Sequence, residues 1–107
     1  MTNPRLESFR AMVASNPGNP LARFGLANEA LKAELWSEAV DNLQAYLASY
    51  DDEGNGYGRL AQSLERMGRI EEARQALRDG IAAAYRFGHT GLANELSARL
   101  DEMEEIA

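Results

Sequence analysis

Apolar residues recur at helical spacing along most of the chain. Leu60, Leu64 and Met67 follow one another at intervals of three or four residues, and Leu92 and Leu96 repeat this spacing nearer the C-terminus. Residues at such intervals lie on one face of a helix, where they can be buried together. No segment alternates between apolar and polar residues as a half-buried strand does. The pattern therefore predicts an all-α protein.

Proline, glycine and asparagine residues separate the periodic segments. Asn3-Pro4 and Asn19-Pro20 each combine a side chain that can cap a helix with a proline suited to the first helical position. Gly68 and Gly88 interrupt the pattern between later segments. Six helices are predicted, at residues 4–15, 20–33, 36–50, 55–67, 70–85 and 89–105.

The sequence repeats itself with a period of 34 residues. When residues 20–53 are aligned with residues 54–87, identical residues share columns at helical spacings, so each period contains the same pair of helices. The identical pairs are Leu26 and Leu60, Ala27 and Ala61, Glu38 and Glu72, Ala39 and Ala73, Leu43 and Leu77, and Ala48 and Ala82.

Both ends of the chain continue this repeat as half-copies. Phe9 falls in the column of Leu43, so the N-terminal helix corresponds to the second helix of a repeat. Residues 91–96 (GLANEL) nearly duplicate residues 25–30 (GLANEA), at an offset of 66 residues, so the C-terminal helix corresponds to a first helix.

The period and its small residues resemble the tetratricopeptide repeat family. Leu26-Ala27 with Ala39 supplies the family's pattern of one large and two small residues in one copy, and Leu60-Ala61 with Ala73 supplies it in the next. Small side chains let the two helices of a hairpin approach to about 8–10 Å. The resemblance covers nearly the whole chain.

The resemblance implies a short right-handed α-solenoid of antiparallel helix hairpins. Two full repeats are expected, with a half-repeat helix at each end, in a single domain over residues 1–107. Its parts are an N-terminal half-repeat helix at 4–15, a first repeat at 20–53, a second repeat at 54–87 and a C-terminal capping helix at 89–105.

The resemblance also implies a function in protein–protein interaction. In the family, the first helix of each repeat lines a concave groove that holds a peptide or a partner's helix. The residues expected to line this groove are Leu21, Phe24, Asn28, Lys32, Asn55, Gln62, Arg66 and Asn94.

Carboxamides occupy one column of the expected groove, at Asn28, Gln62 and Asn94. An amide both donates and accepts hydrogen bonds, so the three suit the main chain of an extended peptide. Lys32 and Arg66 form a second column that suits an acidic ligand group. Polar residues on exposed helices also serve solubility alone, and a cation near the C-terminus of a helix is favourable against the helix dipole, so each column also has an interpretation without a ligand.

Aromatic residues are expected in different settings. Phe24 is suited to either an apolar groove contact or the core, and Trp36 is expected to pack between helices. Tyr46 and Tyr50, one turn apart, are expected to cover the outer wall.

Composition narrows the possible functions. Seventeen acidic residues against eleven basic ones give a net charge of −6, which disfavours nucleic acid as a partner. The absence of cysteine and the single histidine, His89, exclude a disulfide scaffold, a thiolate zinc site and a multi-histidine metal site. No nucleophile motif surrounds any serine, so we expect neither an enzyme nor a cofactor. Without an apolar run of about 18 residues, no membrane partner is expected either, and the cytoplasm is the expected compartment.

One acidic segment imitates a calcium-binding loop. Residues 51–56 (DDEGNG) place oxygen-bearing side chains before a glycine, as the opening of an EF-hand loop does. Gln62 stands where the motif requires a bidentate glutamate, so calcium binding is not expected.

Self-association is the alternative function. The unpaired terminal helices of two chains could complete one another head to tail and form a weak homo-oligomer. The acidic end of the last helix, with Asp101, Glu102 and Glu104, weighs against this alternative because its outer face is suited to water.

Overall fold

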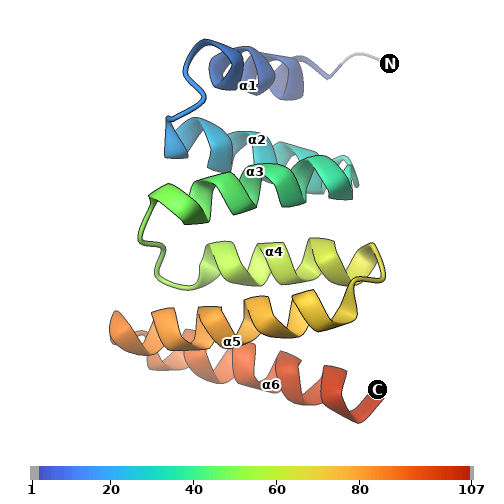
Figure 1. Cartoon of the computed structure of the whole chain (residues 1–107), viewed down its shortest axis with the longest axis vertical. Helices are drawn as coiled ribbons and strands as arrows, with labels where there is room; N and C mark the ends of the chain where they lie inside the picture. The colour runs from blue at the N-terminus through green and yellow to red at the C-terminus, as the bar shows by residue number, and fades with distance from the viewer. Residues whose placement is uncertain (1–2, 107) are drawn as a thin grey trace. The chain divides into compact units, whose positions relative to one another are not determined.

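The computed structural model describes residues 3–106, with side chains as far as Glu104. Six helices cover most of these residues and no strand occurs among them, so the predicted all-α repeat fold is confirmed (Figure 1). The helices are α1 (Pro4–Ser15), α2 (Pro20–Lys32), α3 (Trp36–Ser49), α4 (Asn55–Arg66), α5 (Ile70–Arg86) and α6 (Thr90–Ile106).

The chain divides into two compact units at residues 1–50 and 51–107. The first unit contains α1, α2 and α3, and the second contains α4, α5 and α6. The division falls close to the predicted boundary between repeats at residues 53 and 54. A single domain over residues 1–107 stays a prediction.

The core of the first unit joins all three of its helices. Leu6 of α1, Leu26 and Ala30 of α2, and Ala39 of α3 form one buried cluster. Ala27 and Ala39 have no exposed surface, as expected of the small residues that allow α2 and α3 to pack closely.

The second unit has a larger buried core. Leu64, Leu77 and Leu96, one from each helix, are at most 2% exposed. Gly80 of α5 brings the three helices together, because a Cβ atom there would lie 2.8 Å from the Tyr57 Cβ of α4 and 3.1 Å from a methyl group of Leu96.

Side-chain caps define three helix starts. The Asn3 side chain accepts a hydrogen bond from the amide of Leu6, and Asn19 caps α2 in the same way. At the start of α4, the buried carboxylate of Asp52 accepts hydrogen bonds from the amides of Gly54 (2.7 Å) and Gly56 (2.8 Å). The segment that imitates a calcium loop therefore uses this carboxylate as a helix cap.

Candidate binding surface

Four of the expected groove residues share one stripe of α2 in the first unit. Leu21, Phe24, Asn28 and Lys32 follow one another at intervals of three or four residues, which places them on a single helix face. Leu21 is 68% exposed, more than any other large hydrophobic side chain among those that the structure describes. Phe24 and Asn28 are half-buried and Lys32 is exposed. We call these residues the α2 stripe.

Phe24 continues into a row of aromatic rings. Its ring centroid lies 4.6 Å from that of Tyr46, which in turn stacks on Tyr50 at 5.2 Å. Tyr46 is only 4% exposed, so the expectation that it covers the outer wall is wrong, because its ring packs against Phe24 between α2 and α3. Tyr50 is 44% exposed, so the row runs from the α2 stripe to the surface.

Lys32 already has a partner. Its Nζ donates a hydrogen bond to Glu29 Oε2 at 3.1 Å, and Arg5 Nε of α1 donates to Glu29 Oε1 at 3.2 Å. The bonds from Lys32 and Arg5 lower the pKa of the Glu29 carboxyl, although desolvation partly opposes them. The positive charge expected to face a ligand is therefore partly compensated within the unit.

In the second unit, a comparable stripe runs along α4. Asn55, Gln62 and Arg66 are exposed, and Arg59 lies between them at intervals of three or four residues. We call these four residues the α4 stripe. The sequence analysis did not select Arg59, although its helical spacing from Asn55 and Gln62 was a signal that could have identified it.

Asn94 of α6 is exposed, as Gln62 of α4 is. Leu92 and Leu96 contact α4, at Gly54 and Gly58 respectively. Asn94 is two residues from each leucine, and residues two apart on a helix point in nearly opposite directions. Asn94 therefore lies on the face of α6 opposite these leucines, as Gln62 lies opposite Leu60 and Leu64 on α4, and the alignment of the three carboxamides in one column stays a prediction.

Arg99 is the residue that α6 contributes beside the α4 stripe. Its Nη2 donates a hydrogen bond to the carbonyl oxygen of Gly58 at 3.1 Å, and its guanidinium lies over Gly58 where other residues would have a side chain. With Arg59 and Arg66, it gives this side of the second unit a positive character that suits an acidic ligand group.

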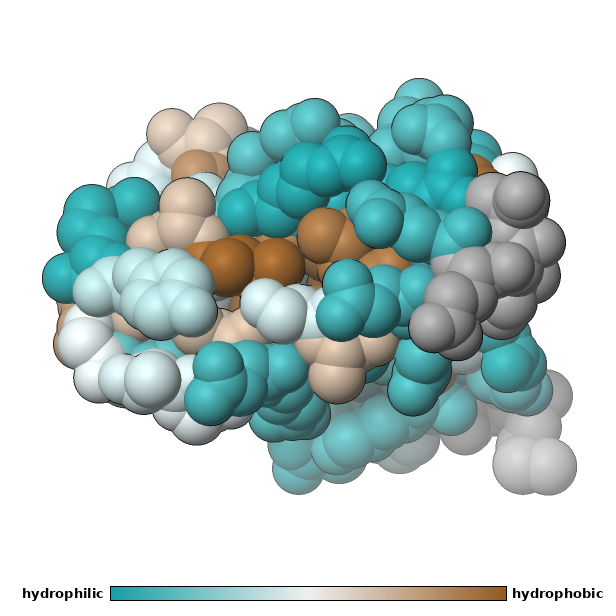
Figure 2. All heavy atoms as spheres, turned by 90° about the horizontal axis from the view of Figure 1, so that it is seen from below, coloured by the Kyte–Doolittle hydropathy of each residue, from teal (hydrophilic) through white to brown (hydrophobic). Residues whose placement is uncertain are grey.

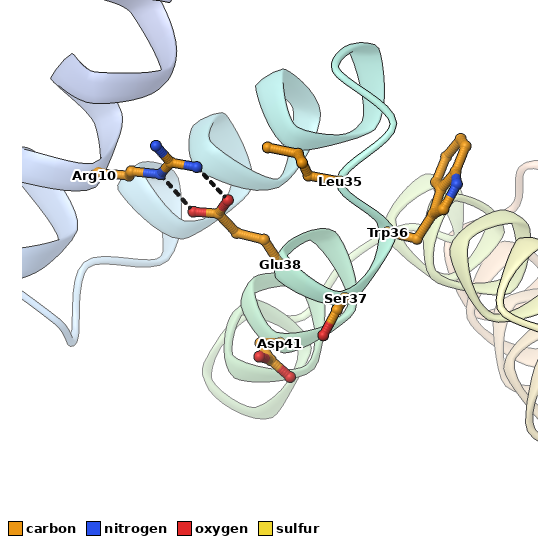
Figure 3. Close-up of a pocket in the computed structure, with 6 residues that line it drawn as sticks. All are labelled: Arg10, Leu35, Trp36, Ser37, Glu38 and Asp41. Carbon is orange, nitrogen blue, oxygen red and sulfur yellow. Dashed lines mark hydrogen bonds and ion pairs between the residues drawn. The ribbon is translucent and has the colours of Figure 1, made fainter.

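An open pocket of about 430 Å³ lies between α1 and α3 in the first unit (Figure 3). Within it, the guanidinium of Arg10 points at the carboxylate of Glu38 and donates two hydrogen bonds, of 2.8 and 2.7 Å. The indole of Trp36 points away from this pair. The paired charges join α1 and α3 across the pocket, and Ser37 and Asp41 of α3 complete its lining.

The two ion pairs of α1 predict how acid affects the first unit. The pKa of Glu38 is lowered by its bonds to Arg10, as that of Glu29 is by Lys32 and Arg5. Their stabilisation is fully present above the unfolded-state pKa of about 4.3 and is lost as the pH falls through the lower folded-state values. We therefore expect the melting temperature to fall less steeply below about pH 4.3 in a double variant, Glu29→Gln with Glu38→Gln, than in the wild type. Melting curves over a pH series measure this, and parallel profiles would contradict the assignment.

The rest of the described chain offers no metal site. Among the residues that the structure places, no three histidine, aspartate or glutamate side chains are grouped so that they could hold an ion. None of the described helices is long and apolar enough to cross a membrane.

Comparisons with known proteins agree with the repeat architecture. No family model matches the chain. The TPR repeat-containing protein PA0015 of Pseudomonas aeruginosa is 27% identical over 99 residues, which cover 92% of this chain and 94% of that protein. The solution structure of protein BPP2914 from Bordetella parapertussis superposes with a TM-score of 0.79 at 28% identity, covering 98% of this chain and 90% of that one. The resemblance to the tetratricopeptide repeat family, predicted from the 34-residue period, is therefore confirmed.

Proposed function

We propose that this protein is a non-catalytic protein-interaction module that binds polypeptide segments on the exposed faces of its first-half helices. The observation that carries the proposal is the exposure of Leu21 in line with Phe24 and Asn28. A single exposed leucine is ordinary on a protein surface. Here it adjoins a half-buried phenylalanine that continues into a row of aromatic rings, and such rings are common anchors in interfaces.

The two stripes suit different ligand groups. On the α2 stripe, Leu21 and Phe24 suit an apolar side chain, and the amide of Asn28 suits the adjacent main chain. On the α4 stripe, Gln62 lies between Arg59 and Arg66, an arrangement that suits an acidic side chain. Exposed polar contacts of this kind contribute little each, so we expect modest affinity. The net charge of −6 does not favour nucleic acid, and the cytoplasm is the proposed compartment.

The test selects ligands from a displayed peptide library and compares their affinities for matched variants. Replacing Leu21 by aspartate is expected to weaken binding about tenfold or more, because a charge would replace the apolar contact. Met12→Asp is the control, since Met12 is 46% exposed on α1 and lies outside the stripe. Selected peptides that bind the Leu21→Asp variant as tightly as the wild type would contradict the proposal.

A second variant separates the amides from the apolar contact. Asn28→Ala combined with Gln62→Ala should weaken binding while leaving helicity and melting temperature unchanged. Unchanged affinity in this double variant would leave the carboxamides with a role in solubility alone.

The surfaces of the two terminal helices, α1 and α6, do not favour self-association. The exposed residues of α6 include Asn94, Glu95 and Glu102, so its outer face is polar. Arg5 of α1 occupies the same column of the repeat as Ala39 of α3 and Ala73 of α5. The two alanines are fully buried, whereas the side chain of Arg5 is 71% exposed. A long charged side chain there opposes the close packing that small residues allow. Sedimentation over a concentration range measures this, and a dimer at micromolar concentration would favour the alternative.

A further inference from the structure

The end of the second unit formed by α5 and α6 exposes an apolar strip. Figure 2 views the molecule from below Figure 1, where these two helices lie, and apolar side chains gather there between hydrophilic borders. This face is distinct from the α2 and α4 stripes of the proposed function.

Two lines of side chains meet along the α5–α6 boundary. On α5, Arg74, Arg78, Ile81 and Tyr85 share one helix face, and Arg74 donates a hydrogen bond to the carbonyl oxygen of Met103 on α6 at 2.9 Å. Ile81 is half-buried and Tyr85 is 57% exposed. This face of α5 therefore borders α6 and is still open to solvent.

On α6, the matching line is Ser97, Leu100 and Glu104, at intervals of three and four residues. Ser97 and Leu100 are half-buried. Arg78 Nη2 lies 3.4 Å from Glu104 Oε1, which joins the two lines at one end. We call Arg78, Ile81, Tyr85, Ser97, Leu100 and Glu104 the α5–α6 strip.

The first unit shows what packs on such a pair of helices. There α1, a second-half helix, and α2, a first-half helix, are covered by α3, which shares a core with Leu6 and Leu26 and bonds to Arg10 through Glu38. In the second unit α5 and α6 are the same kinds of helix in the same order, and none of the described helices takes the place of α3.

The position of one arginine strengthens the comparison. Arg10 and Arg78 fall in the same column of the 34-residue repeat, two periods apart. Arg10 makes two hydrogen bonds to Glu38 of the covering helix, whereas the side chain of Arg78 is 45% exposed and, among the side chains that the structure describes, makes the longer contact to Glu104. The guanidinium of Arg78 can therefore bind a carboxylate on a helix that covers the strip.

We infer that the α5–α6 strip docks one amphipathic helix of a partner protein, in which an acidic residue is followed directly by a small one. Glu38-Ala39 of α3 is the template, because Glu38 bonds to Arg10 while Ala39 packs in the shared core. The α1 helix of a second copy does not fit this description, because Pro4 and Arg5 occupy the corresponding columns. The α1 helix of a second copy is therefore not the occupant.

A peptide of residues 35–50 of this chain, labelled and added to the full-length protein, tests the inference by fluorescence anisotropy. It carries the α3 pattern and is expected to bind the wild type. Changing Arg78→Glu should weaken that binding about 5–10-fold, because an ion pair is replaced by a repulsion. Combining Arg78→Glu with Glu38→Arg in the peptide should restore the affinity to within about twofold. Arg69→Glu, an exposed charge reversal at the N-cap of α5, is the matched control and should leave binding unchanged.

Four further outcomes decide the remaining alternatives. An Ala39→Arg peptide should bind weakly, since the small residue is part of the pattern. Loss of binding in an Arg10→Glu variant but not in Arg78→Glu would mean that the peptide replaces α3 in the first unit, and would overturn the inference. Absence of any binding by the wild-type peptide, or a dimer whose formation the peptide inhibits, would overturn it as well. None of these outcomes depends on Leu21, so failure here is distinguishable from failure of the proposed function.

Discussion

Replacing Gly54 by alanine is expected to lower the free energy of unfolding of the second unit by about 2–4 kcal/mol. Gly54 has a φ of +127°, a region that residues with a Cβ atom rarely adopt. An added Cβ would also lie 2.9 Å from a methyl group of Leu92 and 3.1 Å from the backbone oxygen of Gly80. A backbone oxygen within a packed helix cannot move aside easily, so α4, α5 and α6 would all have to shift.

Gly68→Ala is the matched control for this change. Gly68 also has a positive φ, of +77°, but a Cβ there would meet no atom within 4 Å. We expect a loss of about 1–2 kcal/mol from backbone strain alone. Chemical denaturation followed by far-ultraviolet circular dichroism measures both variants. Equal losses would show that the contacts around Gly54 are unimportant and that strain explains the whole effect.

Gly25→Ala is expected to destabilise the first unit by about 1–3 kcal/mol, although alanine is the better helix former. A Cβ atom on Gly25 would lie 2.2 Å from a ring carbon of Phe9. The ring of Phe9 lies against this glycine, and Leu6 is the one buried residue of α1, so the added methyl group would push α1 away from α2. Thermal melting of the full chain measures the change.

Gly91→Ala provides the contrast. Gly91 also lies within a helix, but its Cβ would meet nothing within 4 Å, so the usual gain of about 0.5–1 kcal/mol for glycine to alanine is the upper limit expected there. Phe9→Leu should recover part of the loss when added to Gly25→Ala. If Gly25→Ala raised the stability as Gly91→Ala does, the close contact of Phe9 would not limit the packing of α1.

The helices could be predicted from sequence because their ends carry strong local signals. Asn3-Pro4 and Asn19-Pro20 begin α1 and α2 at the predicted residues, and every other helix end lies within one residue of its prediction. The 34-residue period also identified the small residues between the helices of each hairpin, since Ala27, Ala39, Ala61 and Ala73 are all at most 1% exposed, whereas Ala48 and Ala82 in another repeated column are exposed. Periodic spacing reports directly on which side of a helix is buried.

The binding surface could be predicted only in part, because the direction in which each side chain points depends on how neighbouring helices pack. Asn94 shares a sequence motif with Asn28 and is exposed like Gln62, but the alignment of the three carboxamides depends on how the helices pack and stays a prediction. Arg99 reaches the carbonyl oxygen of Gly58 because glycine has no side chain in the way. The repeated motif at residues 91–96 ends before Arg99, so it gave no sign of this contact. Tyr46 is buried through its contact with Phe24 of the preceding helix, so its exposure could not be inferred from α3 alone.

The repeat also sets backbone conformation at a position where the residue does not favour it. Glu34 has a φ of +59°, and Gly68, in the same column, has +77°. Glycine is the residue expected at a turn with positive φ. Because the first copy has Glu34 there, the residue type alone did not predict this conformation. The shared geometry of the helix hairpin imposes the same turn on both copies.

The position of Trp36 gives the first unit an optical signature of its own. It is the only tryptophan in the chain and lies half-buried at the first residue of α3, in the first unit. Its selectively excited emission therefore reports on the first unit, whereas the circular dichroism of the peptide groups sums over all six helices. Followed together during denaturation, the two signals distinguish a chain that melts as one cooperative body from one whose halves melt independently.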